Sequence, residues 1–143
     1  MERTELNQLL AEIRTAREKT LAALPAVTED DFDTAVPNPR FDDVRRILLR
    51  FSEHMREHAS QLEGIRVGIG KAPTPPQRML AEAELVWGKV LAATVNLSDA
   101  DLDTIPAEGG WSVRTLLAHL LKGEEGYLST IQTGLQEGKK RTG

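Results

Sequence analysis

The chain contains no cysteine in its 143 residues. Disulfide bonds, thiolate metal ligands and a cysteine nucleophile are therefore excluded, and a protein-bound metal ion must be held through nitrogen or oxygen atoms. A chain without disulfides is also compatible with a reducing compartment.

Long apolar runs and clustered positive charge are missing as well. No apolar stretch approaches the roughly 18 residues of a membrane span, and the first residues, MERTEL, lack the basic and apolar regions of a secretion signal. The net charge is −4 with acidic and basic residues interspersed, whereas a nucleic-acid surface needs a clustered basic face. We therefore expect a cytoplasmic protein that binds neither membranes nor nucleic acid.

What the sequence does contain is four stretches with apolar residues at helical spacing, and none with the alternation of a strand. The second stretch ends near Gly68, before the linker 73–76, and Ser112 is expected to be the N-cap of the fourth. Hydrophobic residues make up 40% of a chain of ordinary domain length, which is enough for a core. The sequence predicts an all-α protein, a four-helix bundle in a single domain over residues 1–143. The expected helices cover about residues 4–24, 42–68, 76–95 and 112–138.

The chain repeats itself at a shift of 70 residues. Between residues 10–34 and 80–104, ten of 25 aligned positions are identical, and at the same shift Phe41 aligns with Trp111. Each half is therefore expected to be a helical hairpin. One hairpin has a single apolar face, so both halves are expected to close one core together. The two predicted halves are about residues 4–70 and 74–138.

Within each half, a capped acidic turn lies between the two helices. The segments 28–31 and 98–101 begin with threonine or serine and end with aspartate, a pattern that suits the start of a short helix. Calcium binding is the alternative, but the glycine and remaining oxygen ligands of a calcium loop are missing. A structural role is therefore favoured.

All three histidines fall in two of the predicted helices. His54 and His58 are four residues apart, so they project from the same face about one turn apart. Two imidazoles on an apolar stripe must satisfy their ring nitrogens away from water, and sharing a divalent cation does so because neutral imidazole is a good ligand. The alternative is a boundary histidine that bonds a carbonyl, and for an isolated HxxxH this is the commoner case.

The predicted fourth helix supplies two further candidates. His119 is the only histidine left as a third ligand, and three imidazoles from two helices would leave coordination positions open for water or substrate. Glu124 lies near the apolar stripe of the same helix. Its carboxylate is a candidate ligand, imidazole partner or general base, with an exposed edge position as an equal alternative.

Two segments resemble the DinB-like superfamily of metal-binding helical bundles. HMREHASQL, residues 54–62, resembles its HxxxHxxQ(I/L) helix, and WSVRTLLAHL, residues 111–120, resembles its WSxxxxxxHL helix. The resemblance implies a four-helix bundle, a divalent metal ion held by His54, His58 and His119, and a homodimer. Relatives include transferases and isomerases that depend on small cellular thiols.

The order of the two motifs is reversed relative to most family members, which carry the single-histidine helix first. Because the chain is an internal repeat, exchanging the halves about a pseudo-two-fold axis would restore the same site. The ligands are therefore expected to have changed halves together. At the shift of 70, Leu49 aligns with His119, Glu124 with His54, and Leu128 with His58.

These observations lead to a divalent-metal-dependent enzyme that acts on a small molecule, with a thiol-dependent S-transferase as the leading hypothesis. Zinc or nickel would bind the low-molecular-weight thiol as its thiolate and lower the thiol pKa. If the ion held hydroxide, the site would be a hydrolase with Glu124 as proton acceptor. The remaining alternatives are a metal- or small-ligand-binding module without turnover, and a dimerisation domain that has lost the metal.

Overall fold

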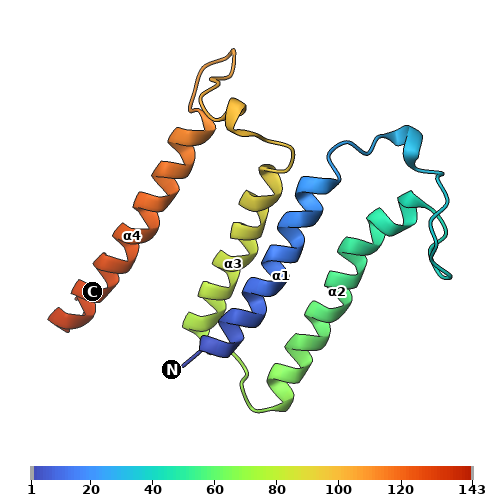
Figure 1. The fold of residues 1–143 in the computed structure, drawn as a ribbon. Coiled ribbons are helices and arrows are strands. Elements are labelled where there is room, and N and C mark those ends of the chain that lie inside the picture. Colours follow the sequence, from blue (N-terminus) through green and yellow to red (C-terminus); the bar gives the residue numbers. More distant parts are fainter. Residues whose placement is uncertain (1, 143) are drawn as a thin grey trace. The chain divides into compact units, whose positions relative to one another are not determined.

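The computed structural model describes residues 2–142, in which α-helices and two short 3₁₀ helices are joined by loops. No β-strand occurs in this range; a single bridge joins Ala35 and Asp43. No helix among these residues is long and apolar enough to cross a membrane. The all-α prediction is confirmed, and each helix lies within about two residues of its expected bounds. The elements are α1 (Thr4–Ala23), η1 (Glu29–Asp31), α2 (Val44–Gly68), α3 (Pro75–Ala93), η2 (Asp99–Asp101) and α4 (Val113–Glu137) (Figure 1).

The two longest helices begin at polar N-caps. The Asp43 carboxylate accepts a hydrogen bond from the Arg46 backbone N–H at 2.8 Å, and α2 follows. The Ser112 hydroxyl accepts from the Thr115 backbone N–H at 3.2 Å, and α4 follows. Each bond satisfies one of the N–H groups that a helix start leaves without a partner. The predicted N-cap at Ser112 is confirmed.

The two acidic turns form the 3₁₀ helices η1 and η2. Each is closed by a capping box, in which the backbone N–H of Thr28 donates to Asp31 at 2.9 Å and that of Ser98 donates to Asp101 at 2.8 Å. The backbone and hydroxyl hydrogen bonds from Ser98 hold the pKa of the Asp101 carboxyl below its ordinary value. The predicted structural role of these acids is confirmed.

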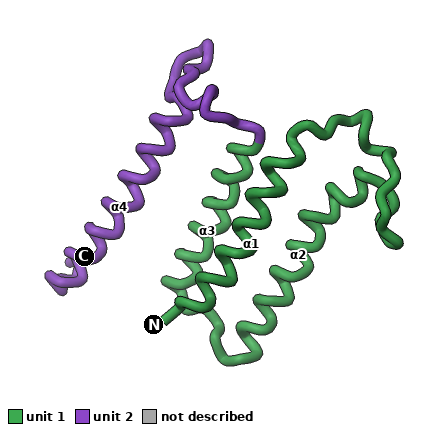
Figure 2. The backbone as a smooth tube through the Cα atoms, in the orientation of Figure 1, with its two compact units in different colours: residues 1–95 green, residues 96–143 purple. Residues whose placement is uncertain are grey.

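The chain divides into two compact units after α3 (Figure 2). Residues 1–95 hold α1, η1, α2 and α3, and residues 96–143 hold η2 and α4. The boundary lies beyond the linker that separates the two sequence repeats. His54 and His58 are in the first unit, and His119 and Glu124 are in the second.

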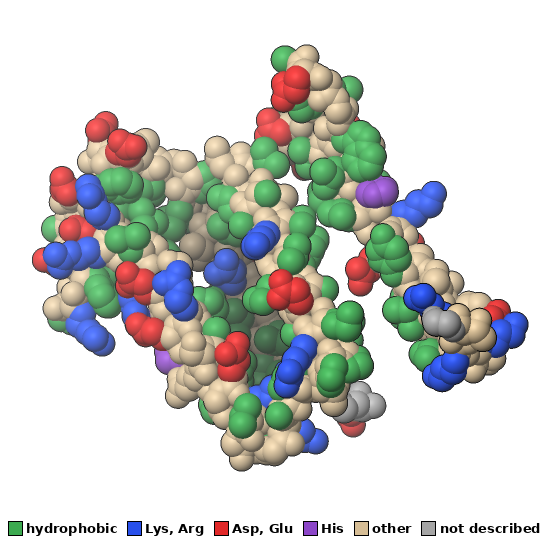
Figure 3. All heavy atoms as spheres, turned by 180° about the vertical axis from the view of Figure 1, so that it is seen from behind, with side chains coloured by type: hydrophobic (Ala, Val, Ile, Leu, Met, Phe, Trp, Pro, Cys, Tyr) green, Lys and Arg blue, Asp and Glu red, His purple; other side chains and the backbone are tan. Residues whose placement is uncertain are grey.

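Apolar side chains lie exposed along all four helices. Figure 3 shows exposed apolar side chains, in green, on the face that it draws. Among the described residues only Ser112, at 8% exposure, is buried. The sequence expectation that both halves close one bundle core stays a prediction. The exposed apolar residues include Leu6, Leu9, Leu10 and Ile13 of α1, Phe51, Met55, Leu62 and Ile65 of α2, Met79, Leu80, Val86 and Leu91 of α3, and Leu116, Leu120, Leu128 and Ile131 of α4.

The number of residues that separates equivalent positions of the two halves changes between the first and the second helix of each half. The C-caps Leu24 and Thr94 are 70 residues apart, as are η1 and η2. The N-caps Asp43 and Ser112 are only 69 apart, and α2 and α4 have the same 25-residue length. The connection in the second half is therefore one residue shorter.

Backbone hydrogen bonds fix this register independently. Arg45 N–H donates to the Phe32 carbonyl, 13 residues earlier, and Arg114 N–H donates to the Leu102 carbonyl, 12 residues earlier. These two bonds occupy the same place in each half. The alignment of α2 with α4 at a shift of 70 is wrong, because one residue is missing from the loop before α4.

Candidate metal centre

His54 and His58 form a pair on one face of α2. Their ring centroids are 4.5 Å apart and the ring planes are nearly perpendicular, at 77°. Both side chains are exposed in the first unit. An imidazole nitrogen lies about 2.0–2.1 Å from a zinc ion, so two rings on one tetrahedral ion have centroids roughly 5 Å apart. The observed centroid spacing of 4.5 Å is close to this value.

A hydrogen bond that His58 donates to Gln61 defines the tautomer of His58. Nδ1 of His58 and Oε1 of Gln61 are 2.7 Å apart. The amide oxygen only accepts, so Nδ1 carries the proton and Nε2 keeps the free lone pair of the neutral ring. Metal-binding histidines are usually held in this way by an acceptor at the second nitrogen. Gln61 is the residue that follows the two histidines in the HxxxHxxQ pattern, and its structural role is to orient His58.

An ion pair lies beside the histidine pair on the same helix. Arg50 binds the Glu57 carboxylate through both terminal nitrogens, at 2.7 and 2.9 Å. The hydrogen bonds from Arg50, with smaller electrostatic contributions from His54 and His58, hold the Glu57 pKa below its ordinary value. The guanidinium lies 5.5 Å from the Phe41 ring centroid. The structure thus gives Glu57 a partner that binds both of its carboxylate oxygens next to the histidines.

His119 lies in α4 against an aromatic side chain. Its ring centroid is 4.8 Å from that of Trp111 at an interplanar angle of 63°, an edge-to-face contact. The imidazole is exposed in the second unit. The tryptophan of the WSxxxxxxHL pattern therefore limits the orientations of this ring, while the fold leaves the ring accessible.

Glu124 is exposed on α4, five residues after His119. Five residues correspond to about 140° around the helix axis, so Glu124 and His119 leave α4 on different sides. In the corrected register Glu124 aligns with Met55 rather than with His54. The alignment of Glu124 with His54 in the repeat is therefore wrong.

The corrected register also changes the counterpart of His119. Both His119 and Arg50 lie seven residues after their N-caps, Ser112 and Asp43. Each is next to an aromatic ring that precedes the helix, Trp111 for His119 and Phe41 for Arg50. In each half, an aromatic ring just before the helix therefore lies next to a nitrogen-containing side chain seven residues after the N-cap. Leu49 is therefore not aligned with His119. In the corrected register His54 aligns with Gly123 rather than Glu124, and His58 aligns with Tyr127 rather than Leu128.

The structure brings together two of the predicted ligands. His54 and His58 are adjacent, whereas His119 belongs to the other unit. Within residues 2–142 no three His, Cys, Asp or Glu side chains are gathered closely enough to hold a metal ion. The three-histidine set stays a prediction.

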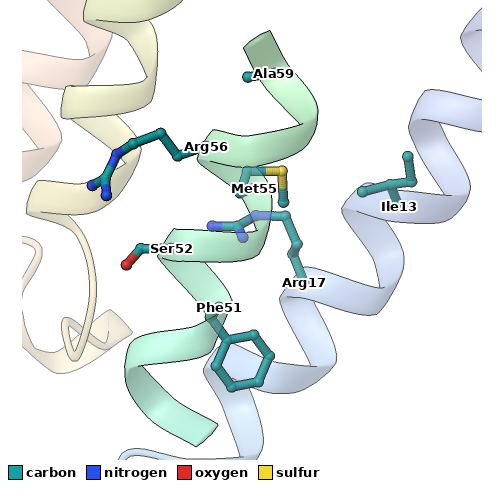
Figure 4. Close-up of a pocket in the computed structure, with 7 residues that line it drawn as sticks. All are labelled: Ile13, Arg17, Phe51, Ser52, Met55, Arg56 and Ala59. Carbon is teal, nitrogen blue, oxygen red and sulfur yellow. The ribbon is translucent and has the colours of Figure 1, made fainter. Parts of the chain in front are cut away.

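A groove lies between α1 and α2 in the first unit, separate from these residues. Its volume is about 510 Å³, and its walls are formed mainly by apolar side chains. The Arg17 side chain extends from α1 toward α2, whereas Arg56 points away from α1 (Figure 4). None of the predicted site residues lines this groove. Its lining consists of Ile13, Arg17, Phe51, Ser52, Met55, Arg56 and Ala59.

Comparison with known proteins points to one family. Residues 82–142 match the DinB superfamily, so the resemblance is confirmed over this segment, which runs from α3 through α4. It contains His119 and Glu124, while His54 and His58 lie outside it. No solved structure matches the chain.

A curated protein also matches part of this chain. The chain is 31% identical over 68 residues to the uncharacterised protein YuaE of Bacillus subtilis (strain 168). The match covers 46% of this chain and 42% of that protein, so the chain spans about two-fifths of the length of its relative.

Proposed function

We propose that this chain is a metal-binding protein of the DinB type in which His54, His58 and His119 hold one divalent ion, zinc or nickel. The observation that carries the proposal is the paired geometry on α2, with ring centroids 4.5 Å apart and Nδ1 of His58 bonded to Gln61. The superfamily match over residues 82–142, which includes the WSxxxxxxHL histidine, supports a third ligand from α4.

The proposed activity is transfer of a small thiol to an electrophilic small molecule. A divalent ion with three imidazole ligands keeps positions open and stabilises a thiolate at neutral pH. The protein's own groups then orient the ligands: Gln61 sets the tautomer of His58, and Trp111 limits the orientations of His119. Glu124 is proposed as proton acceptor if the site instead activates water.

Metal analysis of the untagged full chain tests the proposal. We expect about one equivalent of zinc or nickel in the wild type, and a loss of at least about tenfold in affinity in His58→Ala and in His119→Ala, because each removes a ligand. Arg56→Ala, on the opposite side of α2, is the matched control and is expected to bind normally. Unchanged metal content in His58→Ala, with unchanged helical circular dichroism, would reject the ligand set.

Two further measurements separate the proposed activities. Turnover of an electrophile with a small thiol by the metal-loaded protein supports the transferase, and ester hydrolysis that is lost in Glu124→Gln supports the hydrolase. Stoichiometric binding without either reaction would identify a metal-binding module. Association into a homodimer is also proposed, and sedimentation over a range of protein concentrations tests it.

A further inference from the structure

The Arg50–Glu57 pair is the best-defined side-chain arrangement near the histidines, and it has no role in the proposed ligand set. Seven residues correspond to about 10.5 Å along a helix, so the Arg50 side chain must run along α2 to reach Glu57. Arg50 is half-buried, with its side chain 24% exposed. Both hydrogen bonds of the pair are short, and Phe41 lies against the guanidinium. Two hydrogen bonds and the Phe41 ring therefore hold the pair in one arrangement.

The position of this pair places two opposite charges next to His54. His54 is four residues after Arg50 and three before Glu57, spacings at which helix side chains are neighbours. The guanidinium charge disfavours a cation at the histidines, and the carboxylate charge favours one. While Arg50 and Glu57 are bound to each other, these two effects on a cation nearly cancel.

We infer that Glu57 raises the affinity of the α2 histidines for a divalent cation and that Arg50 lowers it, so that the intact pair leaves this affinity nearly unchanged. The two residues are positioning groups, since neither is proposed to touch the ion. This inference rests on the proposed function, because it concerns the same histidines. It extends that proposal because the affinity for the cation then depends on whether the Arg50 charge offsets the charge of the Glu57 carboxylate.

The two residues are predicted to act with opposite signs. Glu57→Gln removes the favourable charge and leaves the guanidinium uncompensated, so the affinity for zinc should fall about three- to tenfold. Arg50→Met removes the opposing charge and leaves the carboxylate free, so the affinity should rise about two- to fivefold. The double variant should lie within about twofold of the wild type.

The experiment is a calorimetric titration of the full chain with zinc chloride at low salt and at roughly 0.5 M salt. Charge effects between exposed groups should shrink at the higher salt, whereas effects of altered packing should not. Arg50→Lys separates charge from shape, since lysine keeps the positive charge without the two-pronged donor, and it should stay within about twofold of the wild type. Arg56→Met and Glu63→Gln change the same charges on the opposite side of α2 and serve as matched controls.

The outcomes separate the two proposals. Opposite shifts that converge at high salt support the inference. Zinc binding that needs His58, but falls alike in Arg50→Met and Glu57→Gln or changes in neither, overturns the inference alone. A wild type that binds no zinc, or a His58→Ala variant that binds as tightly as the wild type, overturns both proposals. Circular dichroism of each variant shows whether α2 is retained.

Discussion

His58 presents one defined nitrogen because Gln61 accepts a hydrogen bond from the other. The bond joins residues three apart on α2, so it forms within the helix and needs no packing partner. A local bond of this kind preorganises a ligand at little cost in conformational entropy. Among residues outside the proposed ligand set, Gln61 is therefore the one whose substitution should lower the metal affinity most.

We expect Gln61→Leu to weaken zinc or nickel binding about tenfold, since the neutral ring of His58 would then divide between its two tautomers and orientations. Competition with a chromogenic chelator measures the change. Gln132→Leu, an exposed position of α4, is the matched control. Equal affinities for the two variants would show that the hydrogen bond does not matter to the ion.

The capping carboxylate of η2 should give a local dependence on pH. The hydrogen bonds from Ser98 lower the pKa of Asp101 in the folded chain. A carboxyl with a lowered folded pKa stabilises the fold above its unfolded value of about 3.9, and this contribution is lost as the pH falls through the folded value.

The backbone amide proton of Ser98 reports this step by nuclear magnetic resonance. Its chemical shift should stay constant from neutral pH to about pH 4 and move only at lower pH. In Asp101→Asn the movement should vanish. A midpoint at or above the ordinary aspartate value would contradict the lowered pKa.

The helices themselves are set by short-range signals, which explains how much of them the sequence predicts. Ser112, the linker 73–76 and the two acidic turns act within four residues of their own position, so the bounds were predictable to about two residues. The register of α4 was not, because the missing residue lies in a loop whose proline and glycines carry no periodicity. Arg50–Glu57 was also missed, since a spacing of seven is not one of the usual helix pair spacings.

The candidate site divides in the same way. The closeness of the His54 and His58 rings follows from helix periodicity alone and is seen in the structure, whereas their binding of a metal ion stays a prediction. A third ligand from α4 depends on packing between segments far apart in sequence, for which the pattern of one chain gives no distance. That part of the site is therefore a proposal to be tested by metal binding.

The N-caps of the two long helices should each contribute about 1 kcal/mol to stability. Asp43→Ala and Ser112→Ala each remove a side-chain acceptor for a helix N–H and should lower the free energy of unfolding by about that amount, as measured by urea denaturation. Ser129→Ala, inside α4, should cause no loss because alanine favours helix interiors. An unchanged midpoint for both cap variants would show that neither cap is formed in solution.

Whether the whole chain unfolds as one domain is measurable with its two tryptophans. Trp87 lies in α3 of the first unit, and Trp111 precedes α4 in the second. The apolar stripes exposed on all four helices must be covered for the chain to be stable, and the repeat predicts that the halves cover one another.

Single-tryptophan variants, Trp87→Phe and Trp111→Phe, should therefore give the same urea midpoint when followed by fluorescence. Circular dichroism on the same samples provides the control, since it follows both units at once. Two separate midpoints would show that residues 1–95 and 96–143 fold independently.

The shortened connection before α4 has a practical consequence for anyone who recombines the two halves. If the two halves are exchanged at positions 70 residues apart, every residue transferred to the second helix is turned by about 100° around the helix axis. Crossovers placed at the N-caps Asp43 and Ser112 avoid this error, because the helices match residue for residue from those points. Duplicated hairpins that differ by one loop residue can thus diverge in chemistry without any change in their helices.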